Sequence, residues 1–399
     1  MGLRGIFSRL SLGLLSLTIT LFMLEGALRI FAPILPDRLQ IAVQYVQNQT
    51  PYEVDTLDYM TTDIEHGYIL QPNIAHAVQY FSPQVAVEFS TISLWGSRIG
   101  FRTRPIDYLV EVVAVGDSFT FCVTAEEDCW VRRFEAETGL GAVNLGQPGT
   151  ASMSHLRLIE QYAAPLQPRL VLWQFYGNDF FEDFYLAVLR HELPLPESST
   201  HLVDNRPMHD DSLIGWLRAH SLAFATTEVA LGNLWPYLSN YQRLFIEPYT
   251  VPLAGGGALG FGQQYEQIVM NMNDPRQIWG AMYTRRALEQ AQQTVSSWGG
   301  TLVVFFIPTR EQVYAHLTEP YLGRETLDLL DAPYRKMRQL CQALGLICYD
   351  PLEDLQTYAE SGLQLYYADD LHMNATGNGV LAQLLWGWLG GQGLLYGSN

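Results

Sequence analysis

A short strand-like run that ends in a glycine turn and a serine constrains the fold of this chain most. The run Val112–Val115 is apolar and rich in valine, and Gly116, Asp117 and Ser118 follow it directly. Runs of this length and composition predict strands that are buried on both faces, as in a parallel sheet. Open α/β sheets carry their ligand sites beyond the carboxyl ends of the strands, so this pattern places Ser118 where chemistry can occur.

A base for this serine is found near the other end of the chain. Serine is a weak nucleophile until a base removes its proton. The stretch Asp369-Asp370-Leu371-His372 offers a histidine and, three residues before it, a carboxylate. One loop can therefore carry His372 as the base and Asp369 as the group that orients it. The chain order Ser, Asp, His is one of several in which this constellation occurs.

Two further motifs offer hydrogen-bond donors for a negatively charged oxygen. Gly149 ends a stretch that follows a second apolar run, and Asn178 follows the apolar run 170–175. The backbone N–H of Gly149 and the side-chain amide of Asn178 donate hydrogen bonds without bringing a charge. The backbone N–H of Ser118 is a third donor. Acyl transfer needs such donors at the oxygen that becomes negative in the transition state.

These four motifs, in this order, resemble the blocks of the SGNH (GDSL-type) hydrolases. The matching residues are Ser118, Gly149, Asn178 and His372, and the resemblance covers roughly residues 110–385. It is greatest to the membrane-anchored, extracytoplasmic branch, whose first block commonly reads Gly-Asp-Ser-Phe-Thr, as this chain does. The stretch from Leu94 to Arg104 also resembles the Gly-Phe-Arg lead-in that precedes the first block in those relatives.

The resemblance implies a fold and a role for each residue. The expected fold is a flavodoxin-like three-layer α/β/α domain with a parallel sheet. Ser118 would be the nucleophile, His372 the base and Asp369 its orienting carboxylate. The oxyanion hole would consist of Ser118, Gly149 and Asn178. Cys122 departs from the family pattern, because relatives often carry glycine at that position.

Three classes of function remain open at this stage. The first is a serine esterase that cleaves an O-acyl ester, such as an O-acetyl ester, of a cell-envelope carbohydrate or lipid. The second is an O-acetyltransferase that uses the same residues. The third is a non-catalytic binding protein on an SGNH scaffold, because a fold does not determine a function. The sequence predicts no cofactor and no metal for any of them.

Charge excludes one class of partner. The 399-residue chain has a formal net charge of −18 at pH 7. A nucleic-acid partner is therefore not expected, because phosphate binding requires a basic surface. The length suffices for one large domain or two small ones.

The N-terminal sequence is typical of a membrane-spanning segment. The run from Leu10 to Leu24 is apolar apart from Ser and Thr, and Arg4 and Arg9 precede it. Residues 1–35 are predicted to be a cytoplasmic tip and a transmembrane anchor, with the rest of the chain extracytoplasmic. A cleaved signal peptide is the alternative, but no convincing small-x-small site follows the run. Glu25 and Arg29 are four residues apart and can pair on one helix face.

The four cysteines fit an oxidising compartment. Cys122 and Cys129 are seven residues apart, as are Cys341 and Cys348. Four cysteines allow three pairings, of which the two local ones are preferred, and four buried thiols are the alternative. Neither spacing matches the short spacing of a zinc site.

The sequence also predicts how the rest of the chain is divided into segments. Residues 36–107 are predicted to form an extracytoplasmic lead-in with short strands, and 108–399 the SGNH domain. An insertion at about 180–278 is either a lid or substrate wall, or a peripheral elaboration. Arg310 can either reach an anionic group of the substrate or pair with a nearby acid such as Glu311. The expected core strands are 110–115, 142–145, 169–175, 301–307 and 346–349, with helices at 285–298 and 375–389.

Overall fold

The chain divides into two compact units in the computed structural model. The structure describes residues 3–35, 46, 59–80, 85–193, 213–227 and 247–395. One unit comprises Met1–Thr56 and Pro196–Leu244, and the other comprises Leu57–Leu195 and Phe245–Asn399. The predicted lead-in, 36–107, is thus divided between the units, and its residues 36–45, 47–58 and 81–84 lie outside the described part. The second unit holds every predicted site residue.

The first unit contains the N-terminal helix α1 (Leu3–Phe31) and α7 (Leu213–His220). Among the described residues, no helix is both long and apolar enough to cross a membrane. The predicted transmembrane anchor over residues 1–35 is therefore not supported. The predicted pair of Glu25 and Arg29 is present, with Arg29 Nε 2.7 Å from Glu25 Oε1.

A five-stranded parallel sheet is the centre of the second unit. The strand order is β13-β12-β9-β7-β8, which is the flavodoxin-like order. The strands are β7 (Val112–Val115), β8 (Ala142–Asn144), β9 (Leu170–Phe175), β12 (Thr301–Phe306) and β13 (Ile347–Tyr349). Each lies within a predicted core strand. The three central strands β12, β9 and β7 and the edge strand β8 are almost entirely buried, as their continuous apolar composition predicted.

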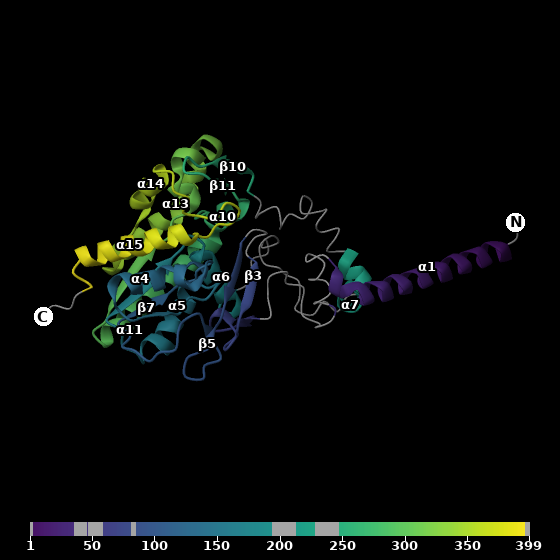
Figure 1. The fold of residues 1–399 in the computed structure, drawn as a ribbon, viewed down its shortest axis with the longest axis horizontal. Helices are drawn as coiled ribbons and strands as arrows, with labels where there is room; N and C mark the ends of the chain where they lie inside the picture. The colour runs from purple at the N-terminus through teal and green to yellow at the C-terminus, as the bar shows by residue number, and fades with distance from the viewer. Residues whose placement is uncertain are drawn as a thin grey trace. The chain divides into compact units, whose positions relative to one another are not determined.

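Helices cover both faces of this sheet and give the three layers (Figure 1). On one face, Trp130 of α4 packs edge-on against Phe305 of β12, with ring centroids 5.0 Å apart. On the other face, Leu288 and Val295 of α11 share one core with Val304 of β12. The helices of these layers include α4 (Trp130–Thr138), α5 (Ser152–Leu158), α6 (Asp179–Leu189), α11 (Pro275–Ser297), α13 (Ala315–Leu344) and α15 (Ala375–Gly391). The predicted α/β/α architecture is therefore confirmed.

Three short hairpins precede the sheet and are attached to it. They are β1–β2 (Met60–Asp63 and Gly67–Leu70), β3–β4 (Ala77–Tyr80 and Ala86–Phe89) and β5–β6 (Ile92–Ser93 and Gly100–Phe101). Gln147, which is fully buried, accepts a hydrogen bond from the Leu70 N–H at 2.9 Å and donates to the Gly100 carbonyl at 3.0 Å. Its own N–H donates to the Gly116 carbonyl. One glutamine thus connects two hairpins to the turn that precedes Ser118.

The described end of the predicted insertion forms a hairpin and a short helix. These are β10 (Tyr249–Pro252), β11 (Ala258–Phe261) and α10 (Gln264–Val269). The Gly260 N–H donates to the Ala368 carbonyl at 2.7 Å, so β11 contacts the segment that leads to His372. Residues 194–212 and 228–246 of the insertion lie outside the described residues, and its role as a lid stays a prediction.

Candidate active site

Ser118 is the first residue of the short helix α3 (Ser118–Phe121), which follows β7 after a two-residue turn. Asp117 caps this helix, because its carboxylate accepts the Phe119 N–H at 2.8 Å. The Asp117 N–H in turn donates to Gln174 Oε1 on the neighbouring strand β9, at 3.0 Å. The turn is therefore fixed from both sides, and Ser118 is held at the carboxyl edge of the sheet, as predicted.

Close packing explains two glycines in this turn. A Cβ added to Gly116 would lie 2.1 Å from Thr120 Oγ1 and 2.4 Å from Gln174 Oε1. A Cβ added to Gly146 would lie 2.3 Å from the Phe121 nitrogen. Because contacts this short cannot be relieved without moving backbone, both positions require glycine. The loop after β8 thus packs directly on the helix that starts with Ser118.

His372 contacts Ser118 and a carboxylate with its two ring nitrogens. Its Nε2 lies 2.7 Å from Ser118 Oγ, and its Nδ1 lies 2.6 Å from Asp370 Oδ1. Ser118 and His372 are therefore brought together as predicted, although they are 254 positions apart. The carboxylate at Nδ1 differs from the prediction, because it belongs to Asp370 and not to Asp369.

A local turn explains why Asp370 occupies this position. Its Oδ1 accepts both the backbone N–H and the ring nitrogen of His372, the former at 2.8 Å. An aspartate side chain that accepts the backbone N–H two residues ahead forms an Asx-turn, as Asp370 does with His372. The turn lies beside an isolated bridge between Tyr366 and Met373, which closes the loop. The motif here is thus Asp-x-His.

Asp370 is buried and remains a carboxylate. Burial alone would raise its pKa, but the charge and the two hydrogen bonds of His372, together with the Arg310 charge, outweigh burial and lower it. An ionised carboxylate fixes the tautomer and orientation of the ring and stabilises the imidazolium. Asp117 differs, because burial raises its pKa to about 6 despite the hydrogen bond from Phe119 and the charge of His372.

The proposed oxyanion donors follow three adjacent strands. Ser118 follows β7, Gly149 follows β8 and Asn178 follows β9, and β7 lies between the other two. Gly149 is exposed and has a φ of +67°, a conformation that favours glycine. The ring of Tyr68 lies next to it, 3.3 Å from the position a Cβ would take. The arrangement brings the three donors to one edge of the sheet.

Asn178, the third proposed donor, directly precedes α6. It stands at the start of α6 but forms no capping hydrogen bond with its side chain. Its Oδ1 is buried without a hydrogen-bond partner. Within the part of the chain that the structure describes, no hydrogen bond of its Nδ2 is found. The amide nitrogen is thus left to bind an added acceptor.

Both local cysteine pairs form disulfides. Cys122 is bonded to Cys129, and Cys341 to Cys348, so the preferred pairing is confirmed. Cys122 ends α3 with a φ of +66°, which accounts for the glycine that relatives often carry there. The first disulfide therefore closes the loop that begins at the nucleophile helix, and the second joins the end of α13 to the edge strand β13.

Comparison with known proteins agrees with this geometry. A family model described as an SGNH hydrolase-like domain, acetyltransferase AlgX, matches residues 274–387. Over this segment, which is less than half of the chain, the sequence is similar to the SGNH hydrolase-like proteins. The matched segment contains Asp370 and His372, whereas Ser118 precedes it. No curated protein matches the sequence.

Solved structures that are similar to this chain are distant in sequence. The acetyl xylan esterase AlAXEase is 10% identical over 70% of this chain and 100% of its own, with a TM-score of 0.37. A catalytic mutant of the acetylxylan esterase Axe2 from Geobacillus stearothermophilus is 11% identical over 72% and 96%, with a TM-score of 0.35. A lipase/acylhydrolase from Enterococcus faecalis is 11% identical over 71% and 97%, with a TM-score of 0.34.

Sequence reasoning missed several groups that support the candidate site. Arg102 is buried and donates to the carbonyls of Phe121 and Thr124 at 3.1 and 2.6 Å, and also to that of Cys122. It thereby holds the backbone that leaves the nucleophile helix. The Gly-Phe-Arg pattern of the lead-in was the signal for it. Gln174 gave no comparable signal, because it looks like a single polar residue in an apolar strand.

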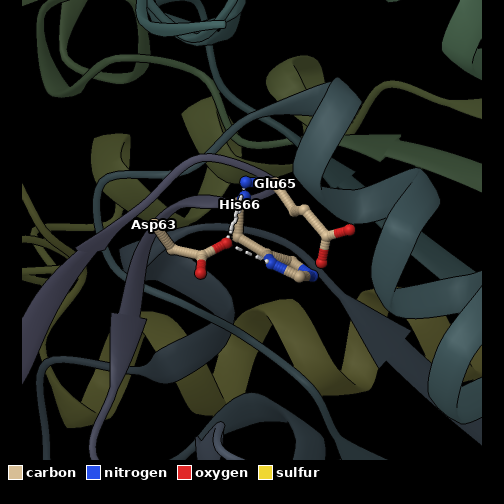
Figure 2. Close-up of side chains that lie close together, drawn as sticks. All are labelled: Asp63, Glu65 and His66. Atoms are coloured by element: carbon tan, nitrogen blue, oxygen red, sulfur yellow. Dashed lines mark hydrogen bonds and ion pairs between the residues drawn. The ribbon is translucent and has the colours of Figure 1, made fainter.

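One side-chain cluster in the β1–β2 turn has the residue types of a metal site. Figure 2 shows Asp63 and Glu65 on either side of His66. Arg98 pairs with both carboxylates, and His66 Nδ1 is 2.9 Å from Asp63 Oδ1. Burial lowers the pKa of His66 to about 4, which keeps the ring neutral. Because Arg98 already pairs with both acids, these residues fit an ion-paired turn better than a cation site.

Proposed function

We propose that this protein is a serine-dependent acyl-ester enzyme that works through an acyl-enzyme. One observation carries the proposal, namely the chain of contacts from Ser118 Oγ through His372 to Asp370 at 2.7 and 2.6 Å. An alignment of this kind activates a serine for attack on a carbonyl carbon. The burial of the His372–Asp370 pair supports it, because exposed groups would be screened by water.

In the first half-reaction, Ser118 Oγ forms a bond to the ester carbonyl carbon while His372 Nε2 takes its proton. The oxyanion that results would be held by the N–H groups of Ser118 and Gly149 and by the Asn178 amide. Removal of one such donor costs about 3 kcal/mol of barrier. The tetrahedral intermediate then collapses. The alcohol leaves with the proton from His372, and Ser118 keeps the acyl group.

In the second half-reaction, His372 removes a proton from water, whose oxygen attacks the acyl carbon. Collapse returns the proton to Ser118 and releases the carboxylic acid. If a hydroxyl of a second molecule replaces water, the same residues transfer the acyl group. The hydrolase and the O-acetyltransferase are therefore two outcomes of one mechanism.

We propose an O-acetylated or otherwise O-acylated carbohydrate of the cell envelope as the substrate. The family description supports an acetyl group, because it names an acetyltransferase. The two disulfides support an oxidising, extracytoplasmic compartment, where envelope polysaccharides lie. A lipid ester stays the alternative substrate.

The test uses the full chain, a fluorophosphonate probe and p-nitrophenyl acetate. We expect one adduct on Ser118 by mass spectrometry together with nitrophenol release, and neither in the Ser118→Ala variant of unchanged circular dichroism. A folded protein that takes no label would instead support the non-catalytic binding protein. Repeating the reaction with an oligosaccharide acceptor separates the two enzymes, because an acetylated sugar indicates transfer and free acetate indicates hydrolysis.

A further inference from the structure

Arg310 is a fully buried arginine beside the loop that carries His372. It begins the short helix α12 (Arg310–Val313), directly after β12, and its side chain is 0% exposed. A buried guanidinium is strongly disfavoured unless it is paired and hydrogen-bonded. Its burial also excludes the role in which it would bind an anionic group of the substrate. A guanidinium charge that is buried this completely must be compensated by the groups around it.

The partners of Arg310 are two carboxylates and one backbone carbonyl. One terminal nitrogen donates to the Asp370 carbonyl at 3.0 Å, and the other donates to Glu247 Oε1 at 3.0 Å. Its Nε lies 3.5 Å from Glu311 Oε1. Burial alone would lower the pKa of Arg310, but the charges of Glu311, Glu266 and Glu247 raise it above its ordinary value. The guanidinium is therefore charged at every pH at which the protein is folded.

The same carboxylates connect Arg310 to the hairpin of the insertion. Glu311 Oε1 accepts the Gly262 N–H at 2.9 Å, just after β11. Glu247 lies two residues before β10. Glu266, on α10, accepts the Tyr176 hydroxyl at 2.6 Å. The cluster thus joins the β10–β11 hairpin, the start of α12 and the loop of Asp370, and Tyr176 links it to the Asn178 turn.

We propose that Arg310 is a positioning residue for the His372–Asp370 pair, a role that rests on the proposed function. It fixes the backbone of Asp370 by binding the carbonyl of that residue. Its positive charge also contributes to the lowered pKa of the Asp370 carboxyl group. Arg310 touches neither the substrate nor Ser118, so it acts only through Asp370. The β10–β11 hairpin, at the described end of the insertion, then helps to hold the loop that carries His372.

The first test measures kinetics per labelled serine in Arg310→Gln and Arg310→Lys. Fluorophosphonate labelling of Ser118 gives the concentration of competent sites, so that unfolded protein does not count. For p-nitrophenyl acetate we expect Arg310→Gln to lower kcat per site at least tenfold with KM changed less than threefold. Arg310→Lys should recover part of that loss, because it keeps the charge but not the geometry.

The pH profile separates positioning from mere stability. Asp370 and Asp117 interact electrostatically with His372, and Arg310 interacts with Asp370. Loss of the Arg310 cation favours the protonated imidazole, so the acid limb of the kcat profile should move to higher pH in Arg310→Gln. Glu247→Gln keeps an acceptor for Arg310 but removes a negative charge, so the limb should move to lower pH. A destabilised but correctly positioned site would show neither shift.

Arg338 provides the matched control. It also pairs with two carboxylates, Asp331 and Asp350, but it lies on α13 and is partly exposed. Arg338→Gln should leave kcat per site and the profile unchanged. Wild-type kinetics per site and an unmoved acid limb in Arg310→Gln would overturn the role of Arg310. Absence of labelling in the wild type would instead overturn the proposed function, and the positioning role with it.

Discussion

The chain brings its nucleophile and its base to the site by different means. Ser118 starts a helix at the end of a central strand, and its neighbours Asp117, Gln174 and Gly146 hold it from both adjacent strands. His372 lies outside the sheet, on a loop that an isolated bridge between Tyr366 and Met373 closes, shortly before α15. Polar contacts from Asp370 and, through it, from Arg310 hold that loop. We call these the nucleophile arm and the base arm.

The two arms are held in place by different forces. The nucleophile arm depends on close packing, since there is no room for even one methyl group at two of its glycines. The base arm depends on charge, because it contains Asp370, Arg310 and the surrounding glutamates in a buried region. Changes of volume should therefore disrupt the nucleophile arm, and changes of charge should disrupt the base arm.

The largest effect is expected from the carboxylate of the base arm. Asp370→Asn keeps the size of the side chain but removes its charge and disfavours the correct tautomer of His372. We expect kcat for p-nitrophenyl acetate, measured per folded molecule, to fall by on the order of 10⁴-fold. Asp369→Asn is the control and should change kcat only a few-fold. Equal losses in both variants would mean that the two aspartates share the role.

The next effect tests the packing of the nucleophile arm. Gly146→Ala places a methyl group 2.3 Å from the Phe121 nitrogen and must displace α3. A displacement of about 1 Å at a reacting group costs roughly 10²-fold in rate. Gly387→Ala in α15 is the control, since no atom outside its helix lies within 4 Å, and it should be neutral or slightly stabilising. Full activity in Gly146→Ala would show that packing does not set this arm.

The two disulfides offer a comparison at equal loop length. Both close a separation of seven residues, so loop entropy assigns each a similar stabilisation of about 2–3 kcal/mol. Replacing Cys122 and Cys129 by alanine should lower thermal stability and also activity, because the bridge closes the loop after α3. Replacing Cys341 and Cys348 should lower thermal stability alone. Similar activity losses in both double variants would remove any special role of the first bridge.

The smallest effect is a pH dependence of stability that differs between the arms. Burial and the Glu311 charge raise the pKa of Glu266 to about 8, so the folded state retains a proton that the unfolded state has lost. Stability should then fall as pH rises to about 8, by at most about 1.4 kcal/mol per pH unit and group. The pKa of Asp117 is about 6, so this group also makes stability fall with rising pH, but only below about pH 6.

Thermal melts between pH 6.5 and 8 should therefore distinguish the two groups. We expect Glu266→Gln to reduce the slope of the melting temperature in this interval. Asp117→Asn should leave the slope unchanged there and alter it between about pH 4 and 6. If Glu266→Gln changed the slope only between about pH 4 and 6, and Asp117→Asn changed it only between pH 6.5 and 8, the effect attributed to the burial of these two acids would be contradicted.

The nucleophile arm could be predicted from the sequence and the base arm only in part. Strand runs such as 112–115 and 170–175 are short, apolar and continuous, so their position and the site of Ser118 followed from the pattern. Asp369 and Asp370 are adjacent carboxylates in a loop, where no periodicity distinguishes them. The choice depends on which side chain reaches the His372 backbone. Arg310 was visible as a residue after a strand, but its partners, such as Glu247, are remote in sequence.

The apolar run of residues 10–24 led to a prediction that the structure does not support. Together with the apolar residues from Ala27 to Leu35 it predicted a membrane anchor, whereas no helix among the described residues is long and apolar enough to cross a membrane. The insertion was read only as a lid or an elaboration, because its contact from Gly260 to Ala368 joins segments that no local pattern relates. Local patterns predict strands well, whereas contacts between loops require the folded chain.

Gln147 has a consequence for anyone who wishes to trim or recombine this protein. Its side chain bonds the backbone at Leu70 and at Gly100, and its N–H bonds the carbonyl of Gly116. A fragment that begins near residue 108, at the border suggested by the strand pattern, would leave this amide without either partner inside the protein. Chimeras and minimal fragments should therefore keep the hairpins from Met60 onwards with the catalytic half, as a single exchangeable cassette.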